Sequence, residues 1–203
     1  MHNTKLWSPN NTNTNLHKFI NHLDSSLNIK NYDDLHNWSI KYKNDFWSHI
    51  WDFTNFVGEK KGKIFKSSPI FSKNKFFDEC NINYAENCLK KKDNDEAIIF
   101  YSEKKIKRKY SWNELRSAVF KFSNYLKKNN INKNDRIAAI LPNIPETVIT
   151  FLSAAQLGAI WSSCSSDFGK KAIIDRFKQI KPKILLITDY YFYNNKKINT
   201  TRI

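Results

Sequence analysis

Hydrophobic residues in the first quarter of the chain recur at helical spacing. A weak helical pattern covers residues 16–23, and a stronger one between 31 and 56 places aromatic side chains three or four positions apart. Asp33 and Asp34 open the stronger pattern, and carboxylates favour a helix N-terminus because the backbone N–H groups there lack partners. We therefore predict a polar segment over residues 1–30 and a helical N-terminal cap over 31–75, with a loop over 57–75.

The next pattern predicts a hairpin followed by a long helix. Two short strands, 97–101 and 106–110, flank a polar turn at 102–105. Ser111 and Glu114 then have the S-x-x-E spacing of a capping box, in which each side chain accepts a hydrogen bond from the other residue's backbone N–H. Apolar residues recur at helical spacing after this box: Leu115, Val119, Phe122 and Leu126.

From residue 136 the pattern alternates between strand and helix. Short apolar runs of buried-strand type are separated by amphipathic stretches, and Pro145 is well placed in the first turn of a helix. The predicted order is strand 136–141, helix to about 157, strand 159–164, helix 170–180 and strand 184–188. Such alternation is typical of crossovers that build a parallel sheet, so we predict an α/β fold.

The net charge invites a nucleic-acid or membrane function, but the composition argues against both. The 203 residues carry a formal charge of +15, yet only five of the 34 basic residues are Arg, which phosphate and base recognition favour. Asn is also abundant, with 26 residues. We interpret the excess of Lys and Asn as a bias of the whole composition, and expect no nucleic-acid partner.

Cysteine usage and hydropathy bear on the compartment. Cys80, Cys88 and Cys164 form an odd set without C-x-x-C spacing, which indicates reduced thiols and neither a disulfide framework nor a zinc site. The first residues lack the apolar run of a signal peptide, and no stretch approaches the roughly 18 apolar residues of a spanning helix. We predict a soluble, cytoplasmic protein without a membrane partner or a metal site of its own.

Two segments carry a resemblance to a known family. The first runs from Leu141-Pro142-Asn143-Ile144-Pro145-Glu146 through Gly158-Ala159-Ile160-Trp161-Ser162-Ser163 to Asp167-Phe168-Gly169. The second is Asn83-Tyr84-Ala85-Glu86-Asn87. In this order they resemble adenylate-forming, AMP-binding acyl-CoA synthetases, and the acetoacetyl-CoA synthetase branch in particular. The likeness covers roughly residues 30–190.

This resemblance implies a partial large domain over residues 76–203 and a place in an acid–thiol ligase. Such enzymes join acetoacetate to CoA through an acyl-adenylate and use ATP, CoA and Mg²⁺. The family's Gly-rich phosphate loop would require clustered glycines, whereas this chain has four, never two together. The phosphate loop and the lysine of the C-terminal lid would both lie beyond residue 203. We therefore assign no catalytic residue and expect the chain alone to be inactive and to bind no cofactor tightly.

The resemblance also suggests one contact to a cofactor. Asn194, Asn195 and Lys196 fall where related enzymes place a turn of Gly and a cation beside the nucleotide phosphate of CoA. A lysine suits that role as a point charge for phosphate. Asn195 stands where the branch usually has Gly, and Phe192 where it usually has Arg.

Other candidate residues favour structural roles. The segment Trp161–Ser166 could face a ligand at the carboxyl end of a strand, but a packed Trp with hydroxyls that cap the next helix is the plainer interpretation. Ser163 and Ser165 lack a G-x-S-x-G elbow and a nearby His, since all five histidines precede residue 50. Apolar neighbours of Cys164 would raise its pKa and make it unreactive.

Three functional hypotheses therefore remain open. In the first, the chain is part of a ligase, and its partner is the missing remainder of the synthetase. In the second, it is a non-catalytic module, either a binding or regulatory module or a decayed remnant, derived from such an enzyme. A Lys-rich nucleic-acid binder is the third hypothesis, and it predicts binding that weakens steeply with salt. The sequence does not determine the acyl chain or the oligomeric state.

Overall fold

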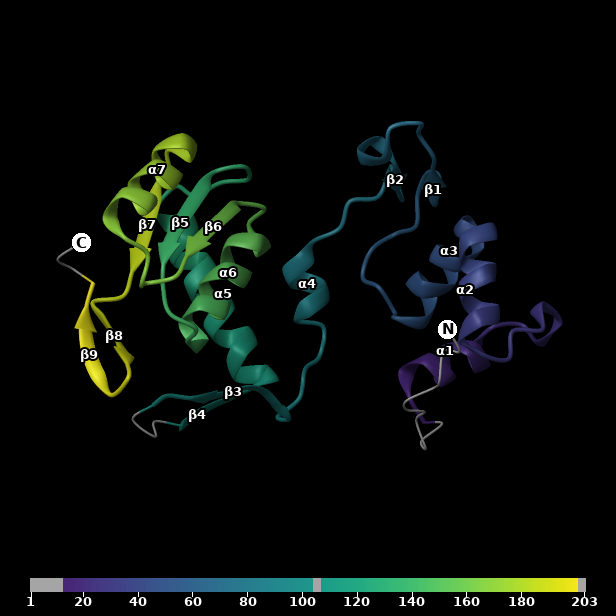
Figure 1. Ribbon diagram of the computed structural model, residues 1–203, viewed down its shortest axis with the longest axis horizontal. Coiled ribbons are helices and arrows are strands. Elements are labelled where there is room, and N and C mark those ends of the chain that lie inside the picture. The colour runs from purple at the N-terminus through teal and green to yellow at the C-terminus, as the bar shows by residue number, and fades with distance from the viewer. Residues whose placement is uncertain (1–12, 104–106, 201–203) are drawn as a thin grey trace, which may run out of the picture. The chain divides into compact units, whose positions relative to one another are not determined.

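The computed structural model describes residues 13–103 and 107–200 (Figure 1). The chain divides into two compact units, Met1–Ile82 and Asn83–Ile203. The first is mainly helical and the second contains a parallel sheet with helices on both faces. The α/β prediction is confirmed.

Aromatic packing holds the three helices of the first unit together. They are α1 (Asn15–His22), α2 (Tyr32–Lys41) and α3 (Lys43–Phe53). Asn31 caps α2 by accepting a hydrogen bond from the Asp34 backbone N–H, and Asp33 and Asp34 lie in the first turn, where the sequence predicted a helix start. The buried cluster comprises Phe19, Leu23, Leu35 and Trp38, with Phe46, Ile50 and Phe53 packed against it.

Short elements complete the first unit. They are the 3-10 helices η1 (Ser25–Leu27) and η2 (Phe71–Lys73) and the two-residue strands β1 (Phe65–Lys66) and β2 (Lys75–Phe76). The strands pair antiparallel within the segment predicted as a loop. Trp51 is buried against the rings of Phe56 and Phe77, so this segment has its own apolar contacts.

Between residues 136 and 187 the second unit alternates strands and helices in the predicted order. Its elements are α4 (Tyr84–Cys88), β3 (Glu96–Tyr101), β4 (Lys107–Ser111), α5 (Trp112–Lys128), β5 (Arg136–Ile140), α6 (Pro145–Gln156), β6 (Ile160–Cys164), α7 (Lys170–Ile180), β7 (Ile184–Ile187), β8 (Tyr190–Tyr193) and β9 (Lys196–Asn199). β3 pairs with β4, and β8 with β9, as antiparallel hairpins.

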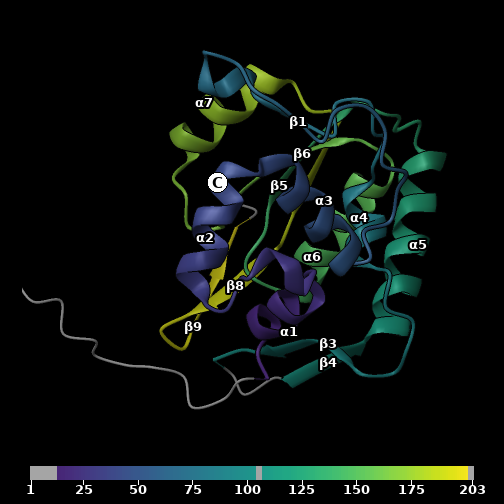
Figure 2. The same cartoon turned by 90° about the vertical axis from the view of Figure 1, so that its right-hand side faces the viewer.

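The parallel sheet has the strand order β6-β5-β7. β5 lies in the middle, and side chains on a strand alternate between its two faces. Ile137 packs in a cluster with Leu126 of α5 and Ala154 of α6. Ala138 packs in a different cluster, with residues of α7 that include Phe177. α5 and α6 therefore cover one face of the sheet and α7 covers the other (Figures 1 and 2).

The Asn83–Asn87 element anchors the start of the second unit. The Asn83 side chain accepts a hydrogen bond from the Glu86 N–H at 3.1 Å and so caps α4. Its amide nitrogen donates to the backbone oxygens of Ala155 and Gln156, at 3.1 and 3.2 Å. One side chain thus satisfies a free donor of α4 and also donates to two carbonyl oxygens in the last turn of α6.

The predicted capping box forms at the start of α5. Ser111 Oγ accepts from the Glu114 N–H at 3.2 Å, and Glu114 Oε2 accepts from the Ser111 N–H at 2.7 Å. This box fixes the point at which the hairpin strand β4 becomes the helix that covers the sheet.

Replacement of Ser111 with Ala should lower the free energy of unfolding by about 1 kcal/mol, because a helix N–H loses its acceptor. Urea unfolding of the two proteins measures the difference. Ser117→Ala is the matched control, since Ser117 is exposed within α5 and not at its end. Equal losses in the two variants would show that the box contributes nothing specific.

Candidate functional site

The carboxyl ends of β5 and β7 border a pocket of about 570 Å³. In parallel sheets ligands gather at this edge, because the loops that follow the strands meet there. Pro142 to Ile144 follow β5, and Thr188 follows β7. The Thr188 N–H donates to the oxygen of Ile140 at 3.2 Å, which holds the two strand ends together. The pocket is also lined by Phe100, Tyr101, Ser102, Glu103, Arg108, Glu146, Asp189, Tyr190, Tyr191 and Phe192.

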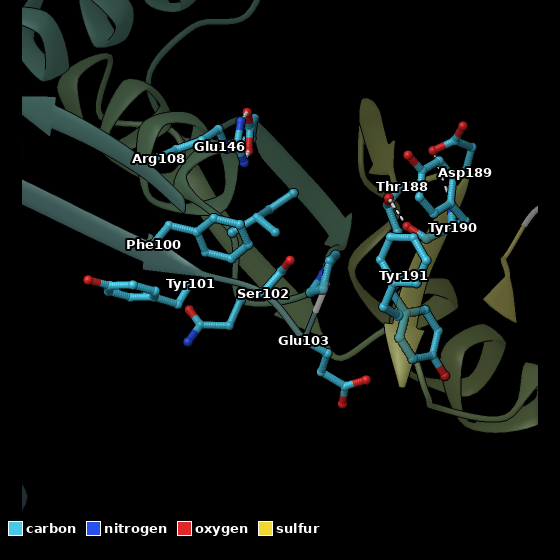
Figure 3. A pocket seen from close by; sticks show the side chains of 14 residues that line it. Phe100, Tyr101, Ser102, Glu103, Arg108, Glu146, Thr188, Asp189, Tyr190 and Tyr191 are labelled. Carbon is cyan, nitrogen blue, oxygen red and sulfur yellow. Dashed lines mark hydrogen bonds and ion pairs between the residues drawn. The ribbon is translucent and has the colours of Figure 1, made fainter. Parts of the chain in front are cut away.

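The pocket has two principal walls (Figure 3). Phe100, Ser102 and Glu103 of the β3–β4 hairpin lie along one side, and residues from Thr188 to Tyr191 lie along the other. The second wall is braced locally, because Thr188 Oγ1 donates to the oxygen of Tyr190 at 2.7 Å. Aromatic rings with a few polar groups between them are typical of a site for a flat organic group.

A bidentate ion pair forms the inner polar part of the first wall. Arg108 Nη2 donates to Glu146 Oε2 at 2.8 Å, and Nη1 donates to Oε1 (Figure 3). The Arg108 guanidinium also lies 5.1 Å from the centre of the Phe100 ring. The hydrogen bond from Arg108 holds the pKa of Glu146 below its usual value. The same contact raises the pKa of Arg108, so both groups stay charged near neutral pH.

Ser102 adds an unused polar group to the pocket. Its hydroxyl oxygen is buried and has no hydrogen-bond partner among the residues that the structure describes. A buried hydroxyl without a partner is costly, so Ser102 is a local source of strain in the pocket wall.

The three residues predicted to contact CoA lie in the β8–β9 hairpin. Asn194 and Asn195 form its two-residue turn, with φ of 48° and 59°. Lys196 is the first residue of β9 and is exposed. Positive φ at both positions is what a type I′ hairpin turn requires, and Asn adopts it more readily than most residues. Asn195 therefore holds the positive φ for which Gly is the usual residue.

The sequence predicts a turn at Asn194–Lys196 but does not predict the hairpin that contains it. The run Tyr190–Tyr193 has the β-propensity of a strand, and Asn-Asn between two such runs is a turn signal. Thr200 just beyond β9 is buried and its N–H donates to Asp189 at 2.9 Å. The tail thus adds ordered structure beside the pocket.

The turn holds a carboxylate from a distant part of the chain. The Asn194 N–H donates to Glu103 Oε1 at 3.2 Å and the Asn195 N–H donates to Oε2 at 2.9 Å. Lys197 Nζ lies 3.9 Å from the centre of the Tyr190 ring, so a second cation is held beside the same hairpin. No local pattern points to Glu103 as a partner of the turn, because 91 positions separate it from Asn194.

The segment after β6 differs from its predicted role in one respect. The N-cap of α7 is Gly169, without a side-chain hydrogen bond, so the serine hydroxyls do not cap this helix. Trp161 is half-buried, and its Nε1 donates to Ser163 Oγ at 3.1 Å. Burial raises the pKa of the Cys164 thiol, which agrees with the expectation of an unreactive cysteine.

Two further findings concern metal binding and membrane spans among the described residues. Among them, no group of three or more His, Cys, Asp and Glu side chains is arranged to hold a metal ion. None of the helices in the same ranges is both long and apolar enough to cross a bilayer.

Comparison with known proteins identifies the family. The sequence profile of the family described as "AMP-binding enzyme" matches residues 85–202, more than half of the chain. The chain belongs to the AMP-binding enzyme family. The pocket and the β8–β9 turn both lie within the region that this family profile matches.

Individual AMP-binding enzymes are similar over most of the chain. The acetoacetyl-coenzyme A synthetase of Rhizobium meliloti is 40% identical over 166 residues, which are 82% of this chain and 26% of the relative. The acetoacetyl-CoA synthetase of Xenopus tropicalis is 38% identical over 200 residues, 95% of this chain and 30% of the relative. The solved acetoacetyl-CoA synthetase of Streptomyces lividans superposes with a TM-score of 0.85 at 26% identity, covering 94% of this chain and 30% of that one. The chain therefore spans less than a third of the length of these relatives.

The Arg108–Glu146 pair makes stability depend on pH. Folding lowers the pKa of Glu146, so the pair stabilises the folded chain above the usual glutamate value of 4.5, and this contribution is lost as pH falls through the lowered folded value. Both side chains are more than a third exposed, which limits the contribution to about 0.5–1 kcal/mol.

The free energy of unfolding of Glu146→Gln should therefore lie below that of the unchanged chain at pH 7 and approach it at pH 3.5, as measured by urea unfolding at both values. The same substitution in an Arg108→Ala background is the control, and there the pH-dependent difference should largely vanish. A difference that persists without Arg108 would assign the effect to another partner.

Proposed function

We propose that this chain is part of an acid–thiol ligase that forms acetoacetyl-CoA from acetoacetate, ATP and CoA. The observation that carries the proposal is 40% identity to a protein named acetoacetyl-coenzyme A synthetase over 82% of this chain, together with a fold likeness of TM-score 0.85 to another. A likeness of this extent runs through both units and is not confined to one motif.

The reaction proposed for the complete enzyme has two steps. The acetoacetate carboxylate attacks the α-phosphorus of ATP and pyrophosphate leaves, and the CoA thiol then attacks the acyl carbonyl and displaces AMP. Mg²⁺ would neutralise charge on the phosphates. The described residues provide no metal-binding cluster, and the sequence has no Gly-rich phosphate loop, so we assign neither adenylation nor metal binding to this chain. Its proposed contribution is scaffold and one contact to CoA.

The contact proposed for CoA is the Asn194–Asn195 turn with Lys196. Two features of the turn support an anion ligand there: consecutive backbone N–H groups already bind a carboxylate, and Lys196 follows directly. Backbone N–H groups arranged in this way and a nearby ammonium group are common means of binding phosphate. The adjacent aromatic pocket has space for a ring carried by the same ligand.

The ligase proposal is tested by determining the coding sequence downstream of codon 203 in all three frames and expressing the joined product. We expect AMP release that requires both acetoacetate and CoA, and much less with acetate or malonate at equal concentration. The 203-residue chain alone, assayed in parallel, should release none. A downstream sequence without a Ser/Thr/Gly-rich loop, or a joined product that is inactive with every acid, would instead favour the binding-module or remnant hypothesis.

Within the joined product, Lys196→Ala should raise the KM for CoA several-fold while the kcat and the KM for ATP stay unchanged. The reason is that a point charge beside an exposed phosphate contributes mainly to binding. Initial rates at varied CoA concentration measure the effect. Lys178→Ala, which removes an exposed lysine from α7, is the matched control. An unchanged KM for CoA would remove the turn from the proposed CoA site.

A further inference from the structure

The Asn194–Asn195 turn presents its backbone N–H groups as a pair. Each group donates to a different oxygen of the Glu103 carboxylate, at 3.2 and 2.9 Å. The positive φ values of both residues, 48° and 59°, create this arrangement, since consecutive residues of a tight turn can direct successive N–H groups to one side. A planar anion with two oxygens is the ligand that such a pair fits.

Glu103 reaches the turn from another element. It lies two residues beyond β3, in the wall of the pocket opposite β8, and its side chain is exposed at the pocket edge. The two hydrogen bonds therefore join the β3–β4 hairpin to the β8–β9 hairpin across the edge of the pocket. They involve no buried charge, so water can replace them when the carboxylate leaves.

Phosphate and carboxylate oxygens compete for the same donors. Both accept charge-assisted hydrogen bonds from backbone N–H groups, and one pair of N–H groups can serve only one of them in full. Because folding holds Glu103 beside the turn, its carboxylate competes within the chain and needs no second molecule. A free anion must therefore overcome this internal competitor before it can bind.

We propose that the Asn194–Asn195 turn is an anion site that Glu103 occupies from within the chain, and that a phosphate group of a nucleotide ligand binds by displacing the Glu103 carboxylate. This inference rests on the proposed CoA contact and adds a competing group to it. Displacement also breaks the link between the two hairpins, so phosphate binding at the turn and access to the pocket are coupled.

The test is a titration of the 203-residue chain, followed by NMR at the amides of Asn194 and Asn195, at constant ionic strength. Two probes are used: inorganic phosphate, and 3′,5′-ADP, which carries the phosphates of the CoA nucleotide. Glu103→Gln keeps the shape of the side chain but replaces one acceptor oxygen with a donor nitrogen. Its affinity for both probes should exceed that of the unchanged chain about 3- to 10-fold.

Glu59→Gln is the matched control, because it removes one exposed carboxylate from the first unit, where Glu59 pairs with Lys61. It should leave both affinities unchanged. An equal rise in the two variants would reduce the effect to net charge and overturn the proposal. Affinity in Glu103→Gln that is equal to or lower than that of the unchanged chain would also overturn it.

The unchanged chain provides a second measurement that needs no variant. Its Glu103 side-chain signals should shift together with the two turn amides and yield one common Kd for phosphate. Turn amides that shift while Glu103 stays fixed, or that never shift, would overturn displacement. If phosphate displaces Glu103 but 3′,5′-ADP binds no more tightly than phosphate, the internal competition stands and the CoA contact fails. If 3′,5′-ADP binds the turn with equal affinity in the unchanged chain and in Glu103→Gln, the CoA contact stands and displacement of Glu103 is overturned.

Discussion

Burial of β5 between two layers is the constraint on which the second unit depends. Every side chain from Ile137 to Ile140 is buried, and alternate residues face opposite layers of helices. A strand in this position cannot tolerate a polar side chain on either face. Its backbone hydrogen bonds to β6 and β7 set the register of the parallel sheet. Because both neighbours run parallel to β5, the segments that follow β5 and β7 meet at one edge.

The pocket follows from this geometry with few additional contacts. Pro142 ends β5, and Pro145 starts α6 with a backbone that needs no donor, so Glu146 lies in the first turn of that helix. There its carboxylate is close to the helix N-terminus and within reach of Arg108 from β4. The ion pair thereby connects a hairpin that is outside the parallel sheet to the edge of that sheet, and the pocket lies beside this connection.

The sequence predicted elements well where local chemistry and burial agree. The Ser111–Glu114 box, Pro145 at a helix start and the apolar run of β5 each depend on residues close in the chain, and the structure confirms them. The pocket, the Arg108–Glu146 pair and the bond from Glu103 to the turn all join residues far apart in the chain. No periodicity or spacing encodes such pairs, and only the folded arrangement of the strands reveals them.

Many of the Asn residues occupy backbone positions with positive φ, which the amino-acid composition alone does not show. Among the described residues, eight other than Gly have a positive φ, and six of them are Asn: Asn28, Asn55, Asn130, Asn134, Asn194 and Asn195. Asn pays less than other side chains for this conformation because its short amide can hydrogen-bond locally. A chain with only four glycines can therefore still make its left-handed turns with Asn. At the β8–β9 hairpin, Asn194 and Asn195 hold the conformation in which two N–H groups donate to the Glu103 carboxylate. A compositional bias and the proposed anion site are thus compatible at the same two residues.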